Sequence, residues 1–153
     1  MTSEAAVSGK GDKADKAAIA IRRAARDRAL QLLYAYEQNK YQDDGRLLPS
    51  DDEPVAEAVA AQAEAWFNGF VGNRVPIDAA IDKRLTNWTI HRLAAVDRNI
   101  LRLGAYEILY DTVTPPKVAI NEAVEMSKRF GSEDKTAKLV NAVLDRLAKD
   151  HPR

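Results

Sequence analysis

VDRNILRLGAYEIL, residues 96–109, is the most apolar stretch of the chain that is compatible with a helix. On a helix with about 3.6 residues per turn, its apolar side chains surround most of the circumference instead of keeping to one stripe. These side chains are Ile100, Leu101, Leu103, Ala105, Ile108 and Leu109. A helix of this kind has to be covered on several sides, so we expect residues 96–111 to form the central helix of a compact all-α domain.

Amphipathic segments on both sides of this stretch provide helices to cover it. Upstream, residues 17–39 carry Ile21, Ala25, Leu32 and Tyr36 at helical spacing, which is typical of one buried face. No segment alternates for long between apolar and polar residues, as a half-buried strand would. The pattern therefore predicts helices throughout the chain.

Capping residues, prolines and a glycine indicate where these helices begin and end. Ser50, followed three places later by Glu53, is a capping-box pattern, and Pro54 suits a first helical turn. Pro116 begins a helix after a break in the chain, and Gly131 ends that helix. We expect seven helical elements: 17–39, 54–73, a short helix after Pro76, a brief turn at 91–93, 96–111, 116–130 and a last helix after Ser132.

Length and composition fit one helical domain with a short extension. The chain has 153 residues, of which 46% are apolar, enough for a real core. Residues 1–16 are rich in Gly, Ser, Ala, Lys and Asp and have almost nothing to bury, so we expect them to be disordered. The helical domain is expected to span residues 17–150.

Several classes of function are excluded by what the sequence lacks. It has no cysteine, which removes disulfides, thiolate metal sites and cysteine catalysis. The two histidines, His91 and His151, have no partners at metal-ligand spacing. No apolar run approaches the ~20 residues that cross a bilayer, and no secretory signal begins the chain. We expect a cytoplasmic protein that is not an enzyme, with no catalytic residues, no metal, no cofactor and no membrane contact.

The charge of the chain is balanced in total but not in distribution. There are 23 basic and 23 acidic residues, yet residues 22–28, RRAARDR, hold four arginines and one aspartate. Arg22 and Arg26 lie one helical turn apart, and Arg23 lies about 100° round from Arg22. The three arginines therefore share one flank of the helix, beside the buried stripe.

This flank has two readings, which the residues alone leave open. Arginine forks suit phosphate oxygens, and Tyr34 on the same helix offers a ring for base stacking, which together favour RNA binding. The alternative is an ordinary charged helix face, with Asp27 as the partner of the arginines.

Three segments together resemble the NusB family of bacterial transcription antitermination factors. They are RRAARDRALQLLY at 22–34, VDRNILRLGAYEIL at 96–109, and PKVAINEAVE at 116–125, which continues with FGSED at 130–134 and VNAVLD at 140–145. The resemblance covers roughly residues 20–148. It implies seven helices in two packed subdomains and no catalysis. It also implies binding to boxA RNA of ribosomal RNA leader transcripts together with NusE, a protein of the small ribosomal subunit. Other Nus factors and RNA polymerase would be reached indirectly.

The resemblance also implies which residues bind RNA. On this chain they are Arg22, Arg23, Arg26, Gln31, Tyr34, Asp134, Lys138 and Asn141. The family usually has Phe and Gly where this chain has Leu139 and Ala142. Because leucine cannot stack on a base as phenylalanine does, we expect weaker binding or compensation by Tyr34.

The NusE surface is expected on exposed residues of the helices 96–111 and 116–130, where acidic groups would suit a basic partner. The candidates are Asp97, Arg98, Arg102, Glu107, Glu122 and Glu125. For each of them the alternative is the ordinary polar face of a helix.

Two other functions remain open at this point. Similar helical domains precede the catalytic domain of ribosomal RNA cytosine methyltransferases, where they assist RNA binding. A homodimer is the other alternative, with an interface of aromatic side chains. Trp66, Phe67 and Phe70 lie close together in sequence, and we expect them in the core rather than at an interface.

Overall fold

The structure is a computed structural model that describes residues 2–42 and 55–153, with side chains from residue 11 onward. Its elements are α1 (Thr2–Gln38), α2 (Glu57–Gly72), α3 (Arg74–Asp82), the 3₁₀-helix η1 (Ile90–Arg92), α4 (Ala95–Leu109), α5 (Pro116–Phe130) and α6 (Thr136–Asp150). These described ranges contain no strand, which confirms the all-α prediction. The capping-box pair Ser50 and Glu53 lies outside them.

The predicted number of helices is right only if the short 3₁₀-helix is counted. In the described part of the chain there are six α-helices, and the brief turn expected at 91–93 is η1. The division into two subdomains stays a prediction. No helix among the described residues is long and apolar enough to cross a membrane.

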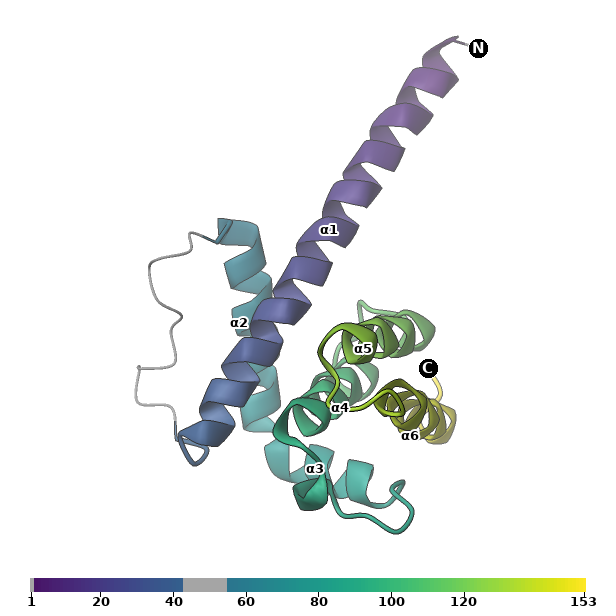
Figure 1. The fold of residues 1–153 in the computed structure, drawn as a ribbon. Helices are drawn as coiled ribbons and strands as arrows, with labels where there is room; N and C mark the ends of the chain where they lie inside the picture. Colours follow the sequence, from purple (N-terminus) through teal and green to yellow (C-terminus); the bar gives the residue numbers. More distant parts are fainter. Residues whose placement is uncertain (1, 43–54) are drawn as a thin grey trace.

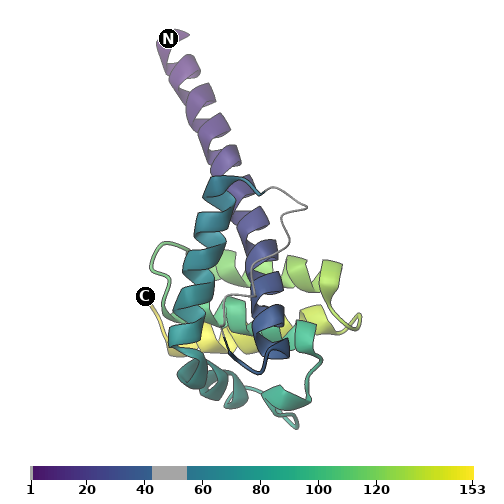
Figure 2. The same cartoon turned by 90° about the vertical axis from the view of Figure 1, so that its left-hand side faces the viewer.

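α4 is the central helix, as its sequence predicts. α1 and α2 lie side by side in one layer, and α4, α5 and α6 pack together behind them (Figures 1 and 2). α4 contacts α1, α2, α3, α5 and α6. Every residue of α4 from Asn99 to Ala105 is buried. Gly104 allows α6 to approach closely, because a Cβ there would lie 2.6 Å from Leu144 Cδ1 of α6.

The three aromatic residues of α2 belong to the core. Trp66, Phe67 and Phe70 are all buried, and the ring of Tyr36 on α1 meets that of Phe67 edge-on at 5.6 Å between centroids. Such edge-to-face pairs add to the stabilisation from buried area. The prediction that these residues are core is confirmed, so they are not available for the interface that the homodimer alternative would need.

The first helix begins well before the expected residue 17. α1 starts at Thr2 and runs through the segment for which the sequence predicts disorder. Residues 11–20 are all exposed, and this part of α1 projects from the domain (Figure 1). Extending an existing helix adds one hydrogen bond per residue without a new nucleation step, which explains how the exposed residues 11–16 are helical.

The last helix, in contrast, begins later than expected. α6 starts at Thr136 and not after Ser132. The carboxylate of Asp97 on α4 accepts hydrogen bonds from the Ser132 backbone N–H at 2.9 Å and the Ser132 hydroxyl at 2.5 Å. It also accepts one from the Thr136 hydroxyl at 3.2 Å. Because Asp97 engages Ser132, this serine anchors the turn before α6 instead of capping the helix.

Candidate nucleic-acid interface

The arginines of α1 do not share one solvent-facing flank. Arg26 is only 3% exposed and forms a two-pronged ion pair with Glu107 of α4. Its Nη2 lies 2.7 Å from Oε1, and its Nε lies 3.0 Å from Oε2. Arg26 is therefore not exposed beside Arg23, as a residue that contacts RNA directly would be. The reason is that α4 packs against α1 at this turn and covers the side chain.

Burial also affects the pKa of Glu107, the partner of Arg26. Burial raises the pKa of Glu107, and the hydrogen bonds and charge of Arg26 oppose this rise. The guanidinium also lies over the Trp66 ring, 5.0 Å from its centroid. Arg26 is thus committed to the interior, where it neutralises a carboxylate that would otherwise be buried alone.

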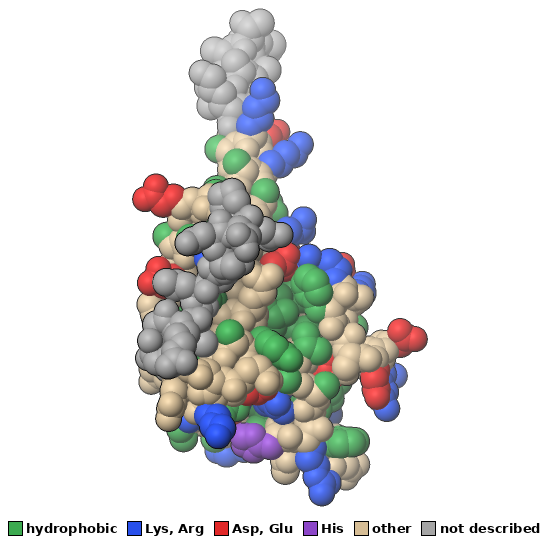
Figure 3. All heavy atoms as spheres, turned by 60° about the vertical axis from the view of Figure 1, so that its left-hand side comes forward, with side chains coloured by type: hydrophobic (Ala, Val, Ile, Leu, Met, Phe, Trp, Pro, Cys, Tyr) green, Lys and Arg blue, Asp and Glu red, His purple; other side chains and the backbone are tan. Residues whose placement is uncertain are grey.

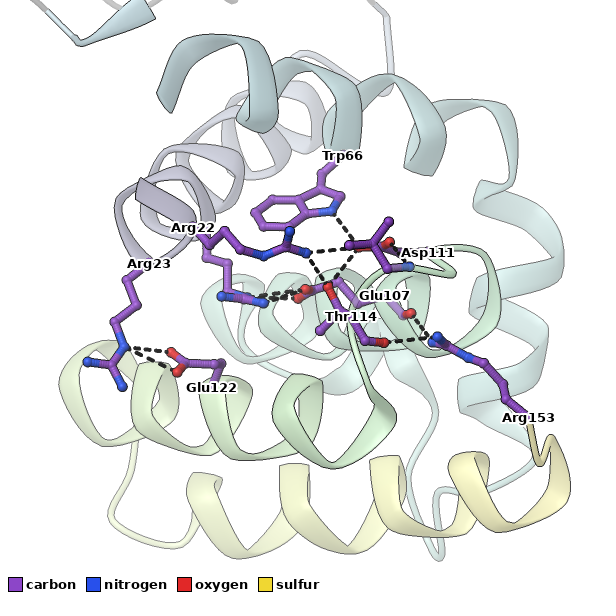
Figure 4. Close-up of polar contacts among 10 residues, drawn as sticks. Arg22, Arg23, Trp66, Glu107, Asp111, Thr114, Glu122 and Arg153 are labelled. Atoms are coloured by element: carbon purple, nitrogen blue, oxygen red, sulfur yellow. Dashed lines mark hydrogen bonds and ion pairs between the residues drawn. The ribbon is translucent and has the colours of Figure 1, made fainter. Parts of the chain in front are cut away.

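Arg22 takes part in a second polar network, at the end of α4. Its Nη2 donates to the Thr114 hydroxyl at 2.5 Å and lies 3.7 Å from Asp111 Oδ2, which also accepts from the Trp66 indole N–H at 3.0 Å (Figure 4). Burial alone would raise the pKa of Asp111, but hydrogen bonds from Trp66, Val113 and Thr114 outweigh it and lower that pKa. Arg22 is half-buried and would have to leave these partners to reach a ligand.

Arg23 is the arginine of this helix most available to a ligand. Its side chain is exposed, and its Nε lies 3.2 Å from Glu122 Oε1 of α5 (Figure 4). An exposed ion pair of this kind contributes only about 0–1 kcal/mol, so a phosphate group can displace the carboxylate at little cost.

Gln31 and Tyr34 lie about two and three turns beyond Arg23 on α1 and are both exposed. They line a hollow of about 400 Å³ with Asp27, Leu30, Val96 and Phe130. Asp27 is not a partner of the α1 arginines but is held by Arg129 of α5, with Nη2–Oδ1 at 2.8 Å. Figure 3 shows apolar side chains gathered on one face of the domain, with lysine and arginine side chains at its border.

The candidates near α6 are on the surface, and one of them lines a second hollow. Asp134, Lys138 and Asn141 are exposed, and Lys138 lines a pocket of about 460 Å³. The remaining lining residues are Trp88, Arg92, Leu93, Ala94, Asp97, Ser132, Glu133, Lys135, Thr136, Leu139 and Ala142. Both hollows reach the start of α4, because Val96 lines one and the next residue, Asp97, lines the other.

Most of the residues expected to bind NusE are buried in the structure. Asp97, Arg102 and Glu107 are buried, and the Arg98 side chain is nearly so. The expectation that these four are exposed is wrong. The reason is that α4 is covered on all sides, so its charged residues point inward and pair there. Only Glu122, which is half-buried, and Glu125 reach solvent.

The buried arginines of α4 form a polar cluster with α1 and α3. Arg102 is fully buried and binds Asp78 through Nε and Nη2 at 2.8 and 2.9 Å. Its Nη1 donates to Glu37 of α1 at 3.0 Å, and Arg98 forms an ion pair with the same carboxylate. Burial alone would raise the pKa of Glu37, yet Arg98 and Arg102 outweigh it and lower that pKa. These contacts fasten α4 to its neighbours.

Sequence reasoning missed four residues around the two hollows: Trp88, Arg92, Arg129 and Phe130. One signal was present, because Trp88 stands between polar Asn87 and Thr89, outside any helical stripe. Phe130, the last residue of α5, is 42% exposed. Among the described residues, no group of three His, Cys, Asp or Glu side chains could hold a metal ion.

Comparison with known proteins gives a consistent result. The sequence model of the NusB family matches residues 23–149. A relative from Anaeromyxobacter sp. (strain Fw109-5), named transcription antitermination protein NusB, is 45% identical over 130 residues, 84% of this chain and 90% of that protein. A protein of the same name from Geobacter sulfurreducens is 39% identical over 133 residues, 86% of this chain and 96% of its own length.

Solved structures agree with the sequence matches. NusB from T. maritima superposes with a TM-score of 0.75 at 34% identity, covering 86% of this chain and 93% of that one. A structure described as antitermination factors NusB and NusE in complex with dsRNA gives a TM-score of 0.73 at 28% identity, covering 86% of this chain and 98% of that one. Fold, family match and sequence identity over most of the chain lead to one conclusion: this protein belongs to the NusB family.

Proposed function

We propose that this protein is a transcription antitermination factor that binds boxA RNA of ribosomal RNA leader transcripts together with NusE. The complex would help to assemble an antitermination complex on RNA polymerase with other Nus factors, in the cytoplasm and without catalysis. One observation carries the proposal: exposed Gln31 and Tyr34 of α1 line one hollow and exposed Lys138 of α6 lines another, and both hollows include a residue from the start of α4. Family membership and the NusB–NusE structure with RNA support it.

The side chains on this face match the chemistry of single-stranded RNA. Arg23 and Lys138 are cations suited to phosphates, and Tyr34 offers a partly exposed ring for stacking on a base. Gln31 and Asn141 carry both donors and acceptors for base edges. Asp134, at the turn before α6, can accept hydrogen bonds from base amino groups.

The two other arginines would act differently. Arg26 would be a positioning residue, because its contact with Glu107 holds α1 on α4 behind the RNA surface. Arg22 would reach RNA only by leaving Thr114 and Asp111. The attraction of Arg22 to RNA phosphates would then compete with its contacts to Thr114 and Asp111.

For NusE, the acidic residues Glu122 and Glu125 of α5 are the candidates that reach solvent. Negative charge there would suit a basic ribosomal protein. The buried residues Asp97, Arg98, Arg102 and Glu107 would contribute by fixing the position of α4 beneath such an interface.

The test is a titration of labelled boxA RNA and a scrambled control at fixed salt, with and without purified NusE. We expect preferential binding to boxA that tightens with NusE. Arg23→Ala should weaken binding by about 1–2 kcal/mol, because it removes a charge-assisted hydrogen bond to phosphate. The matched control is Lys149→Ala, another exposed cation in a weak ion pair, with Asp145. Equal binding of both RNAs in both conditions would exclude boxA recognition.

A further inference from the structure

Trp88 is a large aromatic side chain held at the surface. Its exposed fraction is 54%, in the segment between α3 and η1. The backbone two residues after it is anchored: the Ile90 side chain is fully buried, and its N–H donates to Asp82 Oδ1 at 2.6 Å. Asn87 has a φ of 68°, a left-handed conformation that asparagine tolerates better than most residues. The fold therefore presents the indole to solvent from a fixed segment.

The hollow beside Trp88 combines an apolar floor with a cationic rim. Leu139 and Ala142 contribute apolar surface, and Arg92, Lys135 and Lys138 contribute positive charge. Two carboxylates also line it. Asp97 is engaged by Ser132 and Thr136, and Glu133 forms an ion pair with Lys135 at 3.3 Å. Among the described residues, Arg92 and Lys138 take part in no ion pair, so their charge is available to a ligand.

We propose that Trp88 stacks on one base of the bound single-stranded RNA, while Arg92 and Lys138 contact the flanking phosphates. This inference rests on the proposed RNA-binding function and deepens it. An aromatic ring and cations in one hollow form an arrangement that can bind an unstacked base and its backbone. Leu139 lines the same hollow and offers no ring, so Trp88 supplies the stacking surface that this side of α6 otherwise lacks.

Both hollows lie near the start of α4, within reach of one strand. Tyr34 and Phe130 line the first and Trp88 lines the second, and Val96 and Asp97 of α4 line one each. One strand can therefore place one base beside Tyr34 and another on Trp88. A duplex cannot do this, because its bases are already paired and stacked.

The experiment is equilibrium binding of boxA single-stranded RNA to the full chain, with and without NusE. Trp88→Ala should raise the Kd by between about 5-fold and 150-fold, and Trp88→Phe should retain most of the affinity. The matched control is Tyr110→Ala, which removes a 40% exposed aromatic residue just beyond the other end of α4. Melting temperatures should match the wild type, since Trp88 is not in the core.

Two further readouts separate stacking from charge. Trp88→Ala should leave the salt dependence of log K unchanged, whereas Lys138→Ala should make the slope shallower by about 0.7, because one phosphate is no longer neutralised. RNA should also quench tryptophan emission in the wild type and not in Trp88→Phe, because Trp66 is buried.

An unchanged Kd in Trp88→Ala, with Arg23→Ala still weakened, would overturn the stacking role and leave the proposed function intact. If Trp88→Ala lost binding to NusE in the absence of RNA but kept its RNA affinity, the hollow would belong to the NusE interface. That result would also overturn the stacking role. If the wild type bound no RNA, both the stacking role and the proposed RNA-binding function would be excluded.

Discussion

Arg26 provides the sharpest distinction between an RNA ligand and a structural arginine. Its side chain is 4% exposed and that of Glu107 is 2% exposed, so removing the guanidinium leaves a carboxylate buried without a partner. Breaking a buried pair in this way destabilises a protein by about 3–5 kcal/mol. For a chain of this size that corresponds to a fall in Tm of roughly 6–20 °C. We therefore expect Arg26→Met to lower stability strongly while leaving the RNA affinity of the folded fraction nearly unchanged.

The assay is urea denaturation followed by circular dichroism, with RNA titrations at a temperature where the variant is folded. The control is the double variant Arg26→Met with Glu107→Leu, which removes both charges and should recover much of the stability. Measuring the stability of Arg26→Met at a series of pH values provides a second test. In the single variant Glu107 keeps a raised pKa, so the native state binds the extra proton and stability rises as pH falls toward the unfolded pKa of Glu107.

Two results would refute this reasoning. One is a stability of Arg26→Met within about 0.5 kcal/mol of the wild type, the range of ordinary surface substitutions. The other is a large loss of RNA affinity in the folded variant, similar to that expected for Arg23→Ala. The second result would mean that Arg26 leaves Glu107 when RNA binds.

Three other predictions concern α4 and its neighbours. Leu101→Ala should destabilise the fold by ~2–5 kcal/mol through reduced apolar burial and a residual cavity, and an unshifted Tm would contradict a central α4. Glu37 has a lowered pKa in the fold, so its stabilising contribution is present above the unfolded pKa and lost as pH falls through the folded one. Denaturation between about pH 5 and pH 3 should therefore show a steeper loss of stability in the wild type than in Glu37→Gln, and equal slopes would count against the Arg98 pair. Arg153 donates to the carbonyls of Glu107, Ile108 and Thr114, so Arg153→Ala should cost about 1–2 kcal/mol, against no change for Lys149→Ala.

Much of the fold was predictable because helix signals are local. The apolar stretch 96–109 predicted the central helix, and Pro116 and Gly131 marked the ends of α5. Local signals failed where a tertiary contact competed with them. Ser132 resembles a helix cap in the sequence, but Asp97, 35 residues away, engages its hydroxyl and α6 begins at Thr136.

The candidate site was predicted less well than the fold. The family resemblance named Gln31 and Tyr34 of α1 as RNA-binding residues, and both are exposed. Helical periodicity placed Arg22, Arg23 and Arg26 on one flank. The same periodicity grouped Arg26 with Arg23, although they lie in different environments. Exposure depends on which helix covers each turn, and periodicity along one helix does not contain that information.

By itself, the sequence determined the all-α class, the central position of α4 and the residue types available for RNA contact. Each of these follows from the order of apolar, polar and helix-ending residues along the chain. Only the tertiary structure decided that Arg26, Arg102 and Glu107 are internal, and that Trp88 and Lys138 border one hollow. A charged side chain is internal when a helix distant in sequence covers it and supplies its counter-charge, and the packing of α1 and α3 against α4 produces that arrangement here.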